Sequence, residues 1–180
     1  DVGRNWQRSG EELRALSEGR QRQVREAIPV VKDEIRALKA SLKVARAQKR
    51  TVESGTLGGE LAAAEAALDV LDSLEDHSAE QMKLAEAWVE AGVALRDFDQ
   101  ADRAFDAHRQ RRIIQAERVG RGVDERLDAA GYEVFQQRAR ALETLGKRLS
   151  DLGSEAKSVG KSDMKFMDEL ERDGRIQPRR

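Results

Sequence analysis

Hydrophobic residues recur along most of the chain at alternating steps of four and three. The clearest N-terminal run comprises Val24, Ile28, Val31, Ile35, Leu38, Leu42 and Ala45. The longest run lies in the C-terminal quarter and comprises Phe135, Leu142, Leu145, Leu149, Leu152, Ala156, Val159, Phe166 and Leu170. This spacing is typical of helices that lie along other helices, so the pattern predicts an all-α fold.

The first helix is predicted over residues 10–53. Ser9 and Glu12 have the spacing of a capping box, in which each side chain accepts from the other residue's backbone amide. The run Ser54-Gly55, followed by two more glycines, predicts the end of this helix. The hydrophobic pattern keeps its phase across Pro29, which favours one kinked helix, with a new helix starting at Pro29 as the alternative.

Further helices are predicted over residues 58–75, 79–119 and 132–172. Ser78 and Gln81 match a second capping box, which places a break at Asp76-His77, although the sequence leaves open whether the second and third helices are continuous. The third helix would bury an apolar series that includes Leu84, Trp88, Ala91, Leu95, Phe98 and Phe105. Several glycines between residues 120 and 131 predict a weak segment, and residues 173–180 are expected to form a flexible basic tail.

These elements predict a single all-α domain over residues 1–180, built as an elongated antiparallel bundle or as coiled-coil hairpins. Its longest helices should contain about 40 residues and extend about 60 Å. The first residue is Asp1 rather than Met, so we expect either a domain excised from a longer chain or a processed product.

Composition excludes several classes of protein. The 180 residues include no Cys, which rules out disulfide scaffolds and thiolate metal sites. The net charge of −1 argues against a protein that binds nucleic acid through its whole surface. No apolar stretch is long enough to span a membrane, and the N-terminus has no signal-peptide pattern, so no compartment is indicated.

Charge is unevenly distributed along the chain. Residues 1–50 carry a net charge of +6, residues 51–106 one of −11 and residues 107–180 one of +4. A basic stripe follows the first predicted helix and comprises Lys32, Arg36, Lys39, Lys43, Arg46 and Arg50; acidic residues follow the second, at Glu65, Asp69, Asp72 and Asp76. The stripe is predicted to face this acidic edge within a hairpin. The alternatives are a protein partner, nucleic acid or an anionic membrane surface.

Groups for catalysis are sparse. The two histidines, His77 and His108, lack the spacing of zinc or di-metal carboxylate sites; we expect His77 in a loop and His108 on a helix surface. Gly160-Lys161-Ser162 lacks the earlier glycine and the preceding strand of a phosphate-binding loop. The sequence therefore predicts no catalytic residue, metal or cofactor, and an enzyme without a recognisable motif is the least favoured alternative.

Three glycines recur every seven residues in the last predicted helix. Gly146, Gly153 and Gly160 each cost about 1 kcal/mol of helix stability relative to Ala. They predict a smooth groove where a helix of this chain or of another approaches closely, with Leu149 and Leu152 beside it. The predicted function is therefore a non-catalytic scaffold or adaptor that binds a protein partner, or itself, through helix–helix contacts; the alternative is electrostatic binding through the basic stripe.

Overall fold

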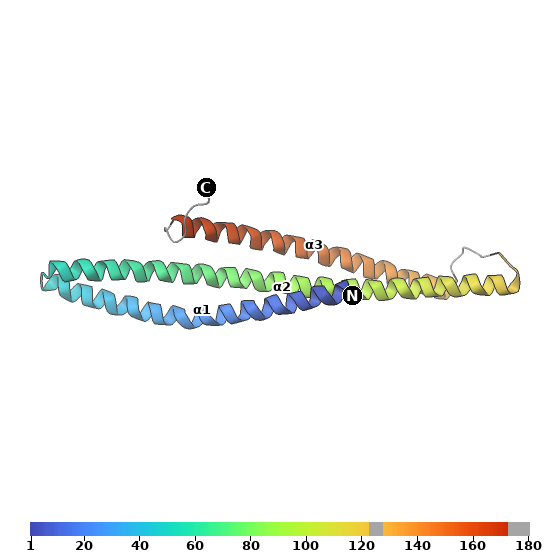
Figure 1. Cartoon of the computed structure of the whole chain (residues 1–180), viewed down its shortest axis with the longest axis horizontal. Coiled ribbons are helices and arrows are strands. Elements are labelled where there is room, and N and C mark those ends of the chain that lie inside the picture. Colours follow the sequence, from blue (N-terminus) through green and yellow to red (C-terminus); the bar gives the residue numbers. More distant parts are fainter. Residues whose placement is uncertain (123–127, 173–180) are drawn as a thin grey trace. The chain divides into compact units, whose positions relative to one another are not determined.

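Three long helices make up the described part of the chain in the computed structural model (Figure 1). The structure describes residues 1–122 and 128–172, and this part of the chain contains no strand. The helices are α1 (Val2–Ala47), α2 (Thr51–Val119) and α3 (Ala129–Arg172). At 1.5 Å per residue, the 69 residues of α2 extend about 100 Å. The predicted all-α fold is confirmed.

The start of α1 lies eight residues before the predicted one. Asp1 caps the helix, because the Arg4 amide donates to Asp1 Oδ1 at 3.2 Å. Ser9 and Glu12 therefore lie inside the helix, and the capping box assigned to them is wrong. Pro29 also lies inside α1, which confirms that a single helix passes through it.

The connection between α1 and α2 is a three-residue turn at residues 48–50. Lys49 has a left-handed backbone with φ of 57°. The Lys49 amide donates to the Arg46 carbonyl at 3.1 Å and the Arg50 amide to the Ala45 carbonyl at 2.9 Å. These two bonds form a Schellman motif, which satisfies carbonyls that the end of α1 leaves unpaired. The predicted helix end at residue 53 is wrong.

The sequence from residue 51 to residue 119 forms one helix. The glycine-rich stretch 54–59 lies inside α2, so the predicted start at residue 58 is wrong. The predicted break at Asp76-His77 is also wrong. Ser78 is 2% exposed, and its hydroxyl donates to the Leu74 carbonyl at 2.8 Å, one turn earlier in the same helix. A serine that makes this bond is compatible with a helix interior, so Ser78 does not cap a new helix.

Gly120 and Asp128 mark the end of α2 and the start of α3. Gly120 has φ of 68°, and the Arg121 amide donates to the Ala116 carbonyl at 3.0 Å in a second Schellman motif. Asp128 caps α3, because its Oδ1 accepts from the Gly131 amide at 2.6 Å. The predicted helix over 132–172 is thus confirmed to within three residues. The weak segment lies partly, and the tail over 173–180 wholly, outside the described residues.

The chain divides into two compact units. The first unit comprises Asp1–Glu12 and Lys83–Lys157, and the second comprises Leu13–Met82 and Ser158–Arg180. In the first unit, the start of α1 packs closely on α2, and small residues fill the core: Ala85, Ala87, Ala91 and Ala94 are at most 7% exposed. Trp88 was expected in this core but is 36% exposed, so that assignment is wrong.

In the second unit, α1 and α2 form an antiparallel hairpin. Its core includes Val24, Ile35, Leu42 and Ala45, all at most 7% exposed. Lys39 Nζ lies 3.1 Å from Glu65 Oε1, and Arg25 Nε lies 2.9 Å from Glu75 Oε1. Because the residue numbers rise on one helix as they fall on the other, these pairs fix the antiparallel register. Residues 158–172 of α3 add a third helix to this unit.

Candidate functional site

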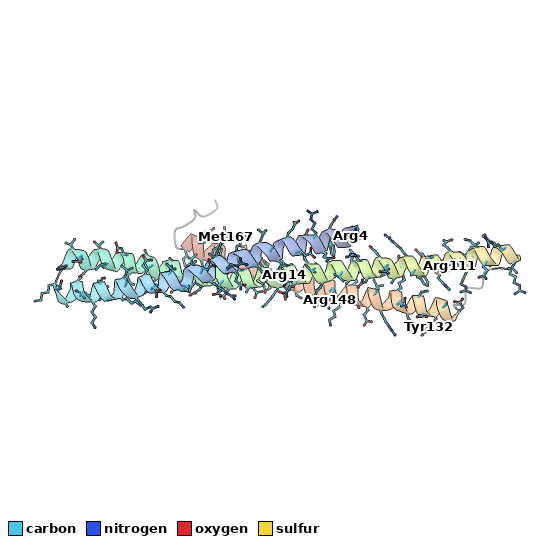
Figure 2. All side chains as sticks on the ribbon, turned by 90° about the horizontal axis from the view of Figure 1, so that it is seen from below. Arg4, Arg14, Arg111, Tyr132, Arg148 and Met167 are labelled. Carbon is cyan, nitrogen blue, oxygen red and sulfur yellow. The ribbon has the colours of Figure 1, made fainter. Side chains whose placement is uncertain are left out.

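Two hydrophobic seams run along α3, one position apart in sequence. One seam packs on α2 and includes Leu145 and Val159, both 7% exposed. In the first unit it also includes Arg148, whose Nη1 lies 2.7 Å from Glu90 Oε2. Arg138 of the same seam pairs with Asp102 and lies over the Phe98 ring, 5.7 Å from its centroid. Figure 2 labels Tyr132, Arg148 and Met167 along the course of α3.

The second seam of α3 faces solvent, and we call it the open stripe. It comprises Phe135, Ala139, Leu142, Gly146, Leu149, Gly153, Ala156 and Gly160, all exposed and all uncharged. Leu142 is 47% exposed and Leu149 is 40% exposed. Steps of four and three separate successive members, so the stripe has the spacing of a helix-binding surface.

The three glycines predicted to line a groove all lie on the open stripe. A Cβ atom on Gly146, Gly153 or Gly160 would have no described neighbour within 4 Å, so no helix of the described chain covers them. Leu149 lies between them on the same face. Leu152 is half-buried on the seam that packs on α2, so it is set apart from the other four. Whether a partner covers the stripe stays a prediction.

Other glycines do allow close helix packing. A Cβ atom on Gly92 of α2 would lie 2.7 Å from both the Gln7 nitrogen and the Gly3 oxygen of α1. One on Gly10 would lie 2.8 Å from the Ala85 oxygen. Sequence reasoning missed these positions, although the signal was present: steps of seven back from Val24 lead to Ser17, Gly10 and Gly3.

The predicted basic stripe is only partly neutralised by α2. Lys39 pairs with Glu65 of α2, as the hairpin model expects. Arg36 pairs with Asp33 of its own helix, and Arg50 Nη1 lies 3.1 Å from Glu53 Oε2 just after the turn. The remaining cations of the stripe are exposed and have no ion pair among residues 1–122 and 128–172; they are Lys32, Lys43 and Arg46.

His77 lies at the centre of a polar layer in the second unit, and not in a loop as expected. Its side chain is 14% exposed, and its Nδ1 lies 3.3 Å from Ser162 Oγ of α3. Its Nε2 lies 3.0 Å from Asp163 Oδ1 and 3.1 Å from Gln81 Nε2. Gln81 in turn accepts from Arg20 of α1 at 3.3 Å. His77 and Gln81 of α2 together therefore connect side chains of α1 and α3.

Ser162, His77 and Asp163 bring together the residue types of a nucleophilic triad, but their setting is not that of an acyl-transfer site. Such a site needs backbone or side-chain donors aimed at a developing oxyanion beside the serine. Ser162 and Asp163 lie in the interior of α3, where the backbone amides are used by the helix itself. The layer is therefore suited to holding α2 and α3 together through hydrogen bonds.

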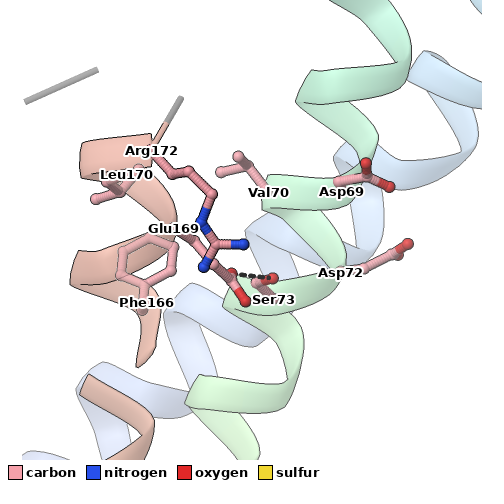
Figure 3. A pocket seen from close by; sticks show the side chains of 8 residues that line it. All are labelled: Asp69, Val70, Asp72, Ser73, Phe166, Glu169, Leu170 and Arg172. Atoms are coloured by element: carbon pink, nitrogen blue, oxygen red, sulfur yellow. Dashed lines mark hydrogen bonds between the residues drawn. The ribbon is translucent and has the colours of Figure 1, made fainter. Parts of the chain in front are cut away.

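A hollow of about 400 Å³ opens beside this layer, between α2 and α3 of the second unit (Figure 3). Its polar wall includes Asp69, Asp72 and Glu169, and Ser73 Oγ donates to Glu169 Oε2 at 3.1 Å. The Arg172 side chain extends over Glu169 in Figure 3. These groups are carboxylates with one guanidinium, without the convergent donors that would orient a ligand.

Known site classes and known proteins give no further assignment. In the described ranges, no group of three or more His, Asp or Glu side chains could hold a metal ion. None of the helices there is both long and apolar enough to cross a membrane. No family model, curated protein or solved structure matches the chain.

Proposed function

We propose that this chain is a non-catalytic helical scaffold or adaptor that binds a partner helix on the open stripe of α3. The observation that carries the proposal is the exposure of an uncharged heptad seam on a protein in which 37% of residues are charged. In such a chain, a run of eight solvent-facing positions without a charge is a feature that folding does not require, because α3 already buries its other seam against α2.

The chemistry of the stripe favours a helix as the partner. An amphipathic helix binds a groove through residues at i, i+3, i+4 and i+7. Leu142 and Leu149 are seven positions apart on the stripe, where such a helix would bind. Gly146 and Gly153 leave room beside these leucines for the side chains of the partner. The glycines also let two helix backbones approach closely, as Gly3 and Gly92 do in the first unit.

The basic stripe of α1 is better explained by ion pairs within the α1–α2 hairpin than by binding of an external anion. Lys39 binds Glu65 of α2, and upstream Arg25 binds Glu75. Only three of its six cations are without an ion pair in the described ranges. Such a set gives few phosphate contacts, and binding of nucleic acid or lipid would be weak and strongly dependent on salt.

Selection from a displayed library of amphipathic helices tests the proposed function. The full chain is immobilised, and retained helices are compared between the wild type and two variants. Leu149→Lys places a charge in the middle of the open stripe, and Lys147→Glu changes a charge outside it. We expect selected helices to lose binding to Leu149→Lys at least tenfold and to retain binding to Lys147→Glu. If no helix is enriched, or if both variants bind equally, the proposal is wrong.

A further inference from the structure

We infer that the partner of the open stripe is the same stripe on a second copy of this chain, in antiparallel orientation about a two-fold axis near Ser150. This inference rests on the proposed function, because it names the partner helix. It depends on two properties of α3: the order of large and small residues along the stripe, and the positions of two charged residues beside it.

The sizes of the side chains are complementary in this register. An antiparallel pairing whose residue numbers sum to about 302 places Leu149 opposite Gly153 of the second copy and Leu142 opposite Gly160. It also places Gly146 opposite Ala156. Each leucine of the stripe thus faces a glycine, as well-packed helix interfaces require. All three glycines of the stripe are used, and the two-fold axis repeats every contact.

A parallel pairing in register would not pack in this way. It would place each glycine opposite itself and each leucine opposite itself. Gly146, Gly153 and Gly160 would then leave gaps between layers of leucine, and such gaps lose the contacts of the atoms that line them. The order of residues along the stripe therefore favours the antiparallel arrangement.

Charge fixes the register. Glu143 and Lys157 flank the stripe on the side away from α2; both are exposed, and neither has an ion pair among the described residues. They lie seven positions on either side of Ser150, so the two-fold axis brings Glu143 of each copy to Lys157 of the other. Positions of this kind set partner choice and orientation in coiled coils. A shift by one heptad would place Glu143 opposite Ser150 or Met164 and lose both pairs.

A charge swap tests the inference on the full chain. Sedimentation equilibrium at low salt gives the dimer dissociation constant of the wild type, of Glu143→Lys, of Lys157→Glu and of the double variant. Each single reversal places two like charges together and should weaken the dimer about tenfold or more. The double variant restores opposite charges across the axis and should recover wild-type affinity. Lys147→Glu is the matched control, and circular dichroism verifies that each variant is folded.

Cross-linking gives a second measurement that does not depend on charge. Because the chain has no Cys, Ser150→Cys introduces a single thiol beside the proposed axis. A short bismaleimide should join two copies of this variant rapidly. It should join Thr144→Cys slowly, because position 144 is on the opposite side of α3 from the stripe.

The outcomes separate this inference from the proposed function. The inference is supported if each single reversal weakens the dimer, the double variant restores its affinity, and position 150 cross-links. A dimer that is insensitive to both reversals overturns the register. A monomer at every concentration overturns self-association, and the scaffold function is then decided by the helix library alone.

Discussion

The imidazole ring of His77 lies nearly parallel to the phenyl ring of Phe166, with their centroids 6.2 Å apart and their planes inclined by 10°. This pair joins α2 to α3 in the second unit, and the nitrogens of the same imidazole contact Ser162, Asp163 and Gln81. One side chain therefore makes both an apolar and a polar connection between the two helices.

This arrangement predicts measurable coupling between His77 and Phe166. We expect His77→Ala and Phe166→Ala each to lower the free energy of unfolding, and the double variant to lose less than the sum. Ring pairs are worth about 0.5–1.5 kcal/mol beyond their burial, and the coupling energy should fall in that range. Urea denaturation of the four proteins in the cycle measures it. Coupling below about 0.3 kcal/mol would show that the stacked geometry does not contribute.

Two glycine-to-alanine substitutions should change stability in opposite directions. Gly92→Ala places a methyl group 2.7 Å from backbone atoms of Gln7 and Gly3, which must move apart. Overpacking of this kind lowers the free energy of unfolding by about 1–3 kcal/mol. Gly59→Ala meets no described atom and should raise it by up to about 1 kcal/mol, because Ala is the better helix former. Thermal and urea unfolding measure both, and the same sign for the two variants would contradict the packing described for Gly92.

The ion pair between Lys39 and Glu65 predicts a small effect that depends on salt. Both side chains are at least half exposed, so the pair contributes about 0.2–1 kcal/mol. Lys39→Glu should therefore lower the free energy of unfolding slightly, and 1 M salt should remove most of the difference. Lys43→Glu, four residues along the same stripe, should have almost no effect. If both variants were equally stable and both lost binding to a polyanion, the basic stripe would be a ligand surface instead.

Asp128 makes stability depend on pH at the start of α3. The hydrogen bond from the Gly131 amide lowers the pKa of the Asp128 carboxyl below its ordinary value of 3.8, and the bond from His108 lowers that pKa further. A carboxyl group with a lowered pKa in the folded state stabilises that state when ionised. Its contribution is complete above pH 3.8 and is lost as the pH falls through the lowered pKa. Unfolding measured from pH 7 to pH 2 should show a smaller acid-induced loss for Asp128→Ala than for the wild type; parallel curves would contradict this role.

The helices themselves could be predicted from the sequence, but the turn between the first two could not. Heptad spacing persists through Val24–Ala45, and α1 follows it without interruption. Local chemistry favours a turn at the glycines of 54–59, whereas the turn forms at Lys49, a residue without a turn preference. Its position accords with the packing of the two helices over their whole length, in which Lys39 lies beside Glu65 and Arg25 beside Glu75. Local sequence does not contain that information.

Only part of the candidate site could be predicted from the sequence. The spacing of Gly146, Gly153 and Gly160 is visible in the sequence, but Leu145, Leu149 and Leu152 look alike there. Only packing against α2 separates Leu145, 7% exposed, from Leu149, 40% exposed. His77 was misplaced for a related reason: Ser78 has the pattern of a helix cap, and nothing local shows that its hydroxyl bonds to Leu74 inside a continuous helix.

The short turn at Lys49 also sets an order of assembly for the hairpin of α1 and α2. Lys39 and Glu65 are 26 positions apart and close a short loop, whereas Arg25 and Glu75 are 50 apart. Closing a loop loses less entropy when the loop is short, so pairing begins beside the turn and spreads away from it. Because α1 and α2 precede α3 in the chain, we expect their hairpin to form first during synthesis and α3 to pack on it afterwards.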